Sequence, residues 1–411
     1  MSSCSKQSKE IRVEVEALFK DNGIQFIALP IPNYPDLYNS NAYNITKMTG
    51  FNTFLRLLLL LALPIQLNAL VQHHGLAKPV PEVQTPPQKA EVYLVRRYSL
   101  SNSVLTGDIT LRLPINGNST GGEFTFFLYS SGTGSSVAVS PHLHKYHYEC
   151  FFAIKGRAQI WAQHDGEAQE ARSIDPDSEV LAVVAPGGFE KLLDVIGRNW
   201  TATTHTPYSN AYIENPGNAT GPVPVAEAEK LTYLDVWSQP DFVPRRDLLN
   251  GTTPGNAAWH DGPNYLGDNS DTSYWVTNGY GPKYLNKAMT GYYQIVQPLI
   301  TPQSSGNYSF TKSTITINGP PSDISALPYQ HFPHGSAFMV LEGTLTIHVE
   351  GYLPVTLVWG DVMYVPKNTR FTYYTSTYWC KFLYVSGGDN CLDTKLIKGG
   401  AAYNSVVIPP H

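Results

Sequence analysis

Hydrophobic and polar residues alternate in many short runs between residue 91 and the C-terminus, the pattern of half-buried β-strands. Turn-forming Gly, Asn, Ser and Pro residues bound these runs. The runs cover residues 91–95, 109–113, 123–129, 158–162, 292–296, 314–317, 337–341, 344–349, 362–365 and 380–385. An apolar run at 180–185 predicts another strand, and residues 189–196 fit a short helix. The pattern predicts an all-β protein built from barrels or sandwiches.

Two stretches of the chain repeat each other. Residues 152–156 resemble residues 339–343, and residues 180–188 resemble residues 380–388. Two similar β-barrels in tandem explain both matches. We therefore expect a first barrel at residues 70–202, a loop-rich connection at 203–283 and a second barrel at 284–411.

The two repeats differ in length between their matching segments. Gly156 and Val180 are 24 residues apart (180 minus 156), whereas Gly343 and Cys380 are 37 apart (380 minus 343). The first barrel is shorter by 13 residues (37 minus 24). At about 3.3 Å per residue, that length is enough for two short strands and a turn. The sequence therefore predicts that the first barrel lacks a hairpin.

The composition agrees with two domains and narrows the class of partner. The chain has 411 residues, of which 12% are aromatic and 15% charged, so it can bury two cores rich in strands. Its net charge is −5 and its pI is about 6.2, without a basic stripe that could neutralise phosphates. A small-molecule ligand is therefore expected, and a nucleic acid is not.

A leader is expected near the N-terminus. The apolar run at residues 57–63 is too short to cross a bilayer, so no stable membrane anchor is expected. It follows Met48 and Arg56 and precedes a small-residue pattern ending at Ala69, the order of a secretory signal peptide. We interpret residues 48–69 as that signal and residues 1–47 as a spurious extension of the gene prediction. A buried helix of an intracellular protein is the alternative.

Secretion into the extracellular space and glycosylation are expected together. Five N-glycosylation triplets follow the leader, at Asn118, Asn199, Asn218, Asn250 and Asn307. Without Cys4, which would leave with the leader, three cysteines remain, too few for a disulfide framework. A bridge between Cys380 and Cys391 stays open.

The chemistry of the chain centres on His142, His144 and Glu149. Histidines two residues apart on a strand point to the same side, and a carboxylate five residues on can fold back to that side. Imidazole and carboxylate ligands suit a divalent first-row ion, but they select poorly among copper, iron, nickel and manganese. The residues predict a metal site whose metal is not specified.

The spacing from His142 through His144 and Glu149 to Gly156 resembles the first motif of the cupin superfamily, with Ser136 where that motif usually has glycine. Within that superfamily, residues from about 90 to 411 resemble the fungal quercetin 2,3-dioxygenases, which are secreted bicupins. The resemblance is carried by residues 142–149, 160–163, 186–190, 203–208, 281–286 and 385–388.

This resemblance implies two jelly-roll cupin barrels and a copper site in the first, with iron, manganese or nickel as alternatives. It implies a flavonol and O2 as substrates, and ring cleavage that releases carbon monoxide and a depside. His142 and His144 would be metal ligands, and Glu149 would be both a ligand and the catalytic base. Phe151 and Phe189 match aromatic residues of the flavonol pocket. The resemblance leaves a homodimer open.

Leu111 falls where the family has a tyrosine that contacts the substrate, so this chain departs from the family at that pocket wall. A third family histidine, carried by a motif that should follow Gly156, has no match before Val180. We expect the missing hairpin to be the one that carries it. His147, His164 and His205 are weaker candidates for the third ligand. His147 is better explained as a packed side chain, and His164 and His205 as loop residues.

In the second barrel, the matching ligand positions hold Tyr329, His331, Ser336 and Phe371, so that barrel is expected to be metal-free, with His334 a loop residue. Three readings remain open for the first. The first is an active enzyme whose hairpin is lost to mispredicted splicing. The second is a non-catalytic bicupin that binds an aromatic ligand or has a structural role. The third is a cupin dioxygenase with another metal and substrate.

Overall fold

The structure, a computed structural model, describes residues 77–409 with several gaps. The gaps are residues 98, 100–102, 107–108, 132–136, 157, 163–168, 174–177, 201–231, 239–263, 271–273, 275, 278, 288, 307–309 and 320–322. The expected extension, the signal peptide and residues Ser136, His164 and His205 lie outside the described residues. The chain separates into the units Met1–Leu67 and Asn68–His411, and every described residue belongs to the second.

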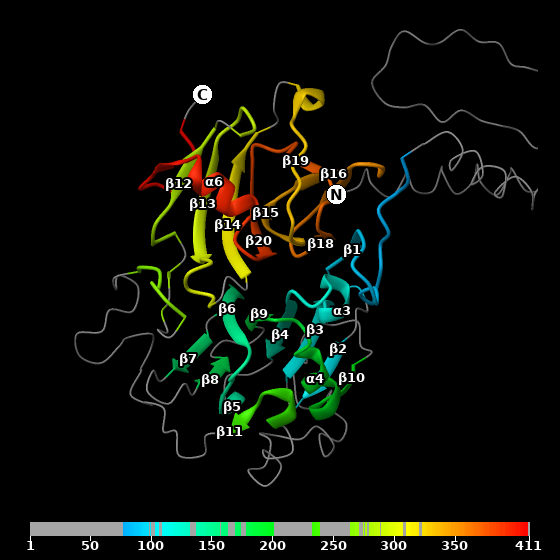
Figure 1. Cartoon of the computed structure of the whole chain (residues 1–411), viewed down its shortest axis with the longest axis vertical. Helices are drawn as coiled ribbons and strands as arrows, with labels where there is room; N and C mark the ends of the chain where they lie inside the picture. Colours follow the sequence, from blue (N-terminus) through cyan, green and yellow to red (C-terminus); the bar gives the residue numbers. More distant parts are fainter. Residues whose placement is uncertain are drawn as a thin grey trace, which may run out of the picture. The chain divides into compact units, whose positions relative to one another are not determined.

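The first barrel is formed by two antiparallel sheets (Figure 1). One has the order β10 (Arg198–Asn199), β2 (Ser103–Thr106), β3 (Ile109–Ile115), β4 (Thr125–Ser131), β9 (Ser178–Ala185) and β6 (Tyr148–Lys155). The other has the order β11 (Trp237–Ser238), β5 (Val137–Leu143), β8 (Gln169–Ser173) and β7 (Ala158–Ala162). The helices are α3 (Gly117–Thr120), α4 (Glu190–Ile196) and the 3-10 turn η3 (Thr232–Leu234).

The second barrel has a larger sheet and a smaller one. The larger has the order β1 (Tyr93–Val95), β18 (Val362–Val365), β15 (Ser336–Gly343), β20 (Trp379–Gly387), β14 (Phe310–Asn318), β13 (Gln294–Ile300), β12 (Tyr284–Asn286) and β21 (Ala401–Ala402). The smaller has the order β17 (Val355–Leu357), β16 (Leu345–Val349) and β19 (Phe371–Tyr374). The 3-10 turn η4 (Ile324–Ala326) and helix α6 (Leu392–Lys398) complete it.

The prediction of an all-β fold with two tandem barrels is confirmed. The matched segments of the sequence repeat are equivalent in space, because β6 pairs with β9 in the first barrel as β15 pairs with β20 in the second. Gly156 and Gly343 end β6 and β15 with φ angles of 72° and 73°, a left-handed conformation that glycine adopts without strain. One difference from the expected division is β1, which precedes the first barrel in sequence but pairs with β18 of the second.

The first barrel has two strands fewer than the second between equivalent points. Four strands, β16 to β19, lie between β15 and β20, whereas the described residues between β6 and β9 form two, β7 and β8. Because β7 pairs with β8 as β16 pairs with β19, the missing strands correspond to β17 and β18. The predicted lack of a hairpin is confirmed. In the part of the chain that the structure describes, the edge of β6 away from β9 has no partner strand.

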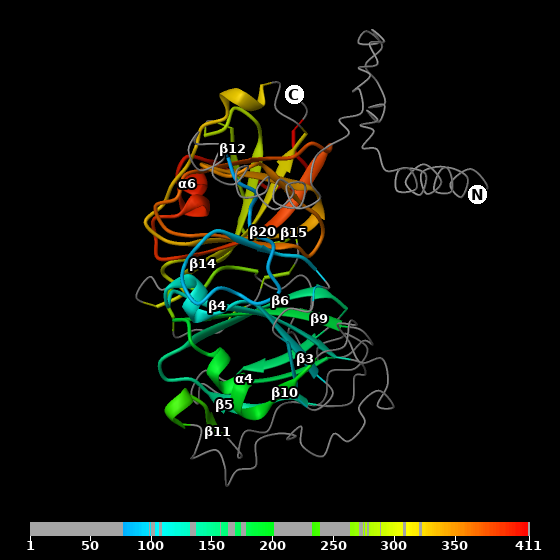
Figure 2. The same ribbon diagram turned by 90° about the vertical axis from the view of Figure 1, so that its right-hand side faces the viewer.

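Alternation along the strands separates three hydrophobic cores. On β4, Phe126 and Leu128 pack between the two barrels, while Phe127 and Tyr129 pack inside the first. The region between the barrels is a continuous apolar core. Figure 2 shows the two barrels stacked along the long axis of the molecule. The interior of the second barrel is filled by aromatic side chains such as Phe338 and Phe371.

Two further features of the described chain concern its cysteines and its helices. Cys150, Cys380 and Cys391 are all buried free thiols, so the bridge left open between the last two is not formed. None of the helices among the described residues has the length and apolar character needed to span a membrane.

Candidate metal centre

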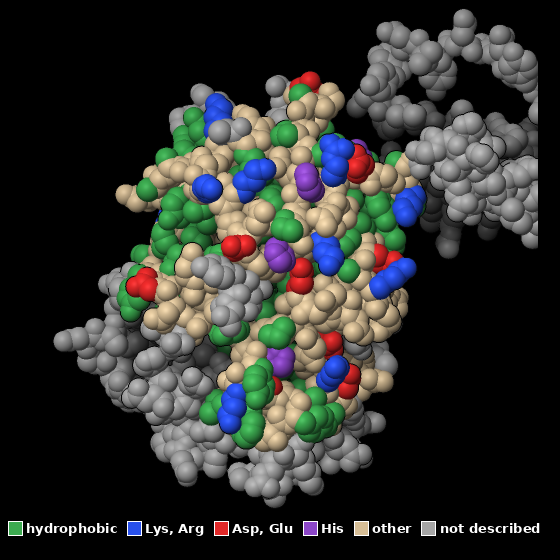
Figure 3. All heavy atoms as spheres, viewed as in Figure 1, with side chains coloured by type: hydrophobic (Ala, Val, Ile, Leu, Met, Phe, Trp, Pro, Cys, Tyr) green, Lys and Arg blue, Asp and Glu red, His purple; other side chains and the backbone are tan. Residues whose placement is uncertain are grey.

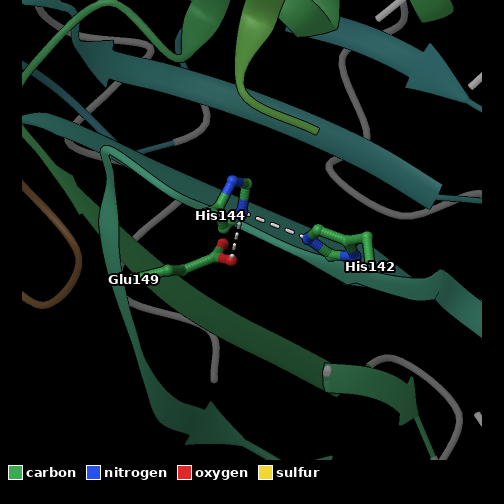
Figure 4. Close-up of side chains that lie close together, drawn as sticks. All are labelled: His142, His144 and Glu149. Carbon is green, nitrogen blue, oxygen red and sulfur yellow. Dashed lines mark hydrogen bonds and ion pairs between the residues drawn. The ribbon is translucent and has the colours of Figure 1, made fainter. Parts of the chain in front are cut away.

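His142, His144 and Glu149 lie together at the end of β5 and the start of β6 (Figure 4). The Nε2 atoms of His142 and His144 are 3.1 Å apart, and His144 Nε2 is 3.4 Å from Glu149 Oε2. The three ligand atoms all lie within 4.8 Å of one another. The side chains of His144 and Glu149 are 5% and 7% exposed, so the cluster is shielded from water.

The donor geometry fits a single metal ion. Ligand atoms about 2.0–2.2 Å from one first-row ion lie roughly 3–3.5 Å from each other, which matches both measured separations. Two imidazole nitrogens at 3.1 Å also need a proton or a cation between them, since two lone pairs would repel. Burial opposes a charge on His144, but Glu149 and Asp235 outweigh it and raise the pKa of the imidazole. The cluster therefore attracts positive charge.

Asp235 contacts both His144 and the turn that follows it. The Nδ1 atom of His144 is 2.7 Å from the backbone carbonyl oxygen of Asp235, so Nδ1 carries a proton and donates it. In the neutral ring, Nε2 then holds the lone pair that faces His142 and Glu149. A hydrogen bond of this kind is the usual way in which proteins orient a histidine ligand.

A second group of potential ligands, His144, His147 and Asp235, has a structural character. The Asp235 carboxylate accepts hydrogen bonds from the backbone N–H groups of Lys145, Tyr146 and His147 and from the His147 ring, at 2.8–2.9 Å. Burial alone would raise the pKa of Asp235, but these donors lower it. Four donors already occupy the Asp235 carboxylate, and the His147 ring is one of them. His147 therefore has a structural role and does not belong to the cluster of His142, His144 and Glu149.

The predicted pocket residues form an apolar wall beside the cluster. Phe189 lies just before α4, and its ring centre is 5.3 Å from that of His144 and 6.0 Å from that of Phe127. Leu111 on β3 is buried, and Phe151 on β6 packs against the same core. The structure thus brings all six predicted site residues to the interior of the first barrel.

Sequence reasoning missed Tyr129 on β4. It pairs across the sheet with Leu111, the position where the family tyrosine was expected, so the two side chains lie on the same face. Its hydroxyl is buried and has no hydrogen-bond partner among the described residues. Burial and the charge of Glu149 raise its pKa, so it stays a neutral donor. The signal available in the sequence was the alternation that puts Phe127 and Tyr129 on one face.

Strand register identifies the position where a third histidine was expected. In the second barrel, Phe371 on β19 pairs with Val349 on β16. Counting from Gly156 and Gly343, Val349 corresponds to Ala162, which pairs with Gln169 on β8. Gln169 is also the cross-strand partner of His142. The position therefore lies on a strand that is present, not on the missing hairpin, and it holds glutamine.

The matching residues of the second barrel do not gather into such a cluster. Tyr329 pairs with His348 through a 2.8 Å hydrogen bond, Ser336 pairs with the hydroxyl of Tyr384 at 2.8 Å, and His331 is exposed. His334 lies 3.1 Å from Glu123 of the first barrel. Within residues 323–409, all of which the structure describes, no three His, Cys, Asp or Glu side chains converge as in the first barrel.

Comparisons with solved structures return proteins of low sequence identity. An oxalate decarboxylase of Lactobacillus farciminis is 12% identical, with a TM-score of 0.41, 76% of this chain covered and 90% of that chain. Procruciferin, an 11S globulin from Brassica napus, is 12% identical, with a TM-score of 0.39 and coverage of 74% and 85%. No protein-family model matches the chain.

Sequence comparison with curated proteins is more informative. The quercetin 2,3-dioxygenase of Aspergillus japonicus is 35% identical over 346 residues, which cover 80% of this chain and 97% of that protein. The quercetin 2,3-dioxygenase of Bacillus subtilis is 22% identical over 316 residues, which cover 72% and 82%. The resemblance inferred from the motifs is confirmed, and the chain belongs to the quercetin 2,3-dioxygenase family.

Proposed function

We propose that the protein is a metal-dependent dioxygenase that cleaves the heterocycle of flavonols with O2 and releases carbon monoxide and a depside. The observation that carries this proposal is the convergence of His142, His144 and Glu149 beside an apolar wall, in a member of this family. A buried donor cluster next to aromatic side chains suits a planar, aromatic substrate with an acidic hydroxyl.

His142 and His144 would hold the metal, together with Glu149. The bound ion would supply positive charge for the deprotonated substrate and a redox-active centre for O2. Glu149 would take the proton of the flavonol 3-hydroxyl, a role that needs a carboxylate within hydrogen-bond reach of that proton. Its position in a buried site, 3.4 Å from His144 Nε2, supports both roles. Copper is the proposed metal, with iron, manganese and nickel as alternatives, because the donor types do not separate them.

The apolar wall would bind the flavonol rings. Phe189 and Phe151 offer aromatic faces, and Leu111 offers an aliphatic contact, so the rings would be held in a site from which water is excluded. The hydroxyl of Tyr129, which has no hydrogen-bond partner among the described residues, would donate a hydrogen bond to a substrate oxygen in place of the family tyrosine that Leu111 replaces.

We also propose that the mature protein is secreted after removal of residues 48–69. Asn118 and Asn199 are exposed, as glycan acceptors must be. N-terminal sequencing of protein from culture medium should give a start just after residue 69. A start near residue 10 would contradict both the signal peptide and the spurious extension.

A second candidate function is favoured by one observation, the glutamine at position 169. With two histidines and one glutamate in its first barrel, the protein would be a non-catalytic bicupin that binds an aromatic ligand, or a dioxygenase for another metal and substrate. A transcript with extra codons between residues 163 and 175 would instead support a splicing error, and a histidine codon among them would complete the ligand set.

Turnover of quercetin separates these functions. Purified protein loaded with each of the four metals in turn would be incubated with quercetin and O2, and carbon monoxide and the depside would be measured. The proposed function predicts both products in equal amounts, and none from His142→Ala. The control is His331→Ala, which changes the second-barrel histidine equivalent to His144 and should keep full activity. Metal binding without either product would support the second candidate.

A further inference from the structure

The connection between the barrels returns to the metal centre at residues 232–238. Strand β11 of this segment pairs with β5, so that Trp237 lies opposite Leu143 and Ser238 opposite His142. Lys145 lies over the ring of Trp237, with 3.4 Å between its Nζ atom and the ring centre. The segment is therefore docked on the strand that carries both histidine ligands.

Asp235 adopts a backbone conformation that turns two of its groups toward the site. Its φ angle is 65°, in the left-handed region that most side chains avoid but that Asp and Asn tolerate. In this conformation its carbonyl oxygen lies 2.7 Å from His144 Nδ1, while its carboxylate accepts hydrogen bonds from the backbone of residues 145–147. One residue thus holds both the ligand ring and the turn behind it.

That turn determines how far Glu149 lies from His144. Residues 145–147 connect the end of β5 with β6, and their three N–H groups all donate to the Asp235 carboxylate. The carboxylate is 4% exposed, so these hydrogen bonds face little competition from water. Without them, the three backbone N–H groups would lose their acceptor, and the turn would be free to change shape.

We propose that Asp235 is a positioning residue of the metal centre: its carbonyl oxygen sets the tautomer of His144, and its carboxylate sets the spacing between His144 and Glu149. This inference rests on the proposed metal site, but it concerns a residue of the connection, 91 positions from His144. It makes metal binding depend on the docking of residues 232–238.

Two substitutions change the carboxylate of Asp235 and keep its carbonyl group. Asp235→Gly keeps the carbonyl group and accommodates the left-handed backbone, but it removes the carboxylate. Asp235→Asn also tolerates that backbone and keeps one acceptor oxygen. Asp268→Asn is the matched control, since Asp268 is an exposed aspartate of the same connection.

The readout is the affinity for Cu(II), measured by competition with a chelator, together with the Cu(II) EPR spectrum and the melting temperature of the metal-free protein. Outer-shell partners of metal ligands are worth about 10–100-fold in affinity. Asp235→Gly should weaken Cu(II) binding by this factor and change the EPR parameters. The Cu(II) affinity of Asp235→Asn should lie between those of Asp235→Gly and the wild type. Asp268→Asn should have the affinity and the EPR spectrum of the wild type.

The outcomes distinguish the two proposals. If wild-type protein binds no metal, or if His142→Ala binds it equally well, the proposed metal site is wrong. If the wild type binds Cu(II) at this site and both Asp235 variants keep its affinity and EPR spectrum, Asp235 is not a positioning residue. A lower melting temperature with unchanged affinity would give Asp235 a purely structural role and would also overturn the inference.

Discussion

The two barrels share a strand plan and differ in what fills their interiors. Both turn at a left-handed glycine, Gly156 or Gly343, and both pair the preceding strand with an equivalent later one. The first barrel has His142, His144 and Glu149 at its centre, whereas the second is packed with aromatic rings. The fold therefore does not determine the chemistry of a barrel; a few positions do.

The equivalent positions show how the second barrel satisfies its polar groups without a metal. Ser336, at the position of Glu149, bonds to the hydroxyl of Tyr384, which in turn accepts a hydrogen bond from the backbone of Leu392. Phe371 packs against Phe338 with ring centres 5.4 Å apart. Histidines occur in both barrels, at positions 142, 144 and 147 in the first and 331, 334 and 348 in the second, so their grouping and not their presence separates the two barrels. Figure 3 shows that histidine side chains also reach the surface on one face of the molecule.

Removing the carboxylate of the first barrel should have the largest effect. Glu149→Gln should lower kcat/KM for quercetin by about 10²–10⁴-fold, because an amide cannot accept the substrate proton. Glu342→Gln changes an exposed carboxylate on β15 of the second barrel and should leave kcat/KM unchanged. Equal effects of the two substitutions would remove the contrast between the barrels.

Adding a histidine at position 169 should sharpen the contrast. Gln169 occupies the register position of Phe371 and lies opposite His142, so Gln169→His offers a third imidazole to the cluster. Metal affinity, measured by chelator competition, should rise by about tenfold or more, since imidazole is a stronger ligand than a neutral amide for these ions. Phe371→His in the second barrel should create no metal site. An unchanged or lower affinity of Gln169→His would show that the register assignment is wrong.

Tyr129→Phe should act with opposite signs on stability and substrate binding. Removing a buried hydroxyl that has no hydrogen-bond partner among the described residues should raise the free energy of unfolding by about 1 kcal/mol in metal-free protein. Loss of the donor to the flavonol should raise KM for quercetin by roughly fivefold, about 1 kcal/mol. Tyr373→Phe is the comparison in the second barrel, where the hydroxyl already bonds to Gln294, and it should destabilise the protein. A destabilised Tyr129→Phe would indicate that the hydroxyl has a partner.

The smallest effect concerns the pH dependence of a buried carboxylate in the second barrel. Burial raises the pKa of Asp393 above its usual value, despite hydrogen bonds from Cys391 and Ser313. Between the unfolded and the folded pKa, the folded protein keeps a proton that the unfolded chain has lost, so stability falls as pH rises through this window. Asp393→Asn does not titrate. Its stability relative to wild type should therefore rise from pH 4 toward pH 7, as measured by urea unfolding, and a difference that is flat or falls with pH would contradict the raised pKa.

The sequence predicted the fold and the centre of the site because both rest on local patterns. A few residues are enough to recognise strand alternation, the repeated glycines and the spacing from His142 to Glu149. The difference of 13 residues between the repeats also predicted the lost hairpin. The sequence did not show which strands were lost, since that depends on the pairing of β7 with β8.

Long-range contacts account for what the sequence did not reveal. Asp235 lies 91 positions from His144, in a loop-rich stretch without a motif. Its contribution depends on a left-handed backbone angle and on docking against β5, and neither is encoded in a local pattern. The strand that contains Tyr129 was predicted, but the place of Tyr129 beside the site depends on its cross-strand register with Leu111.

The most direct test of the central claim is the metal content of three proteins after loading and desalting: the wild type, His144→Ala and His331→Ala. A metal centre at His142, His144 and Glu149 predicts about one ion per chain in the wild type and in His331→Ala, and almost none in His144→Ala, because a ligand lost from the cluster leaves two donors. Metal content that is unchanged in His144→Ala, or lost in His331→Ala, would contradict the claim that the first barrel holds the metal centre.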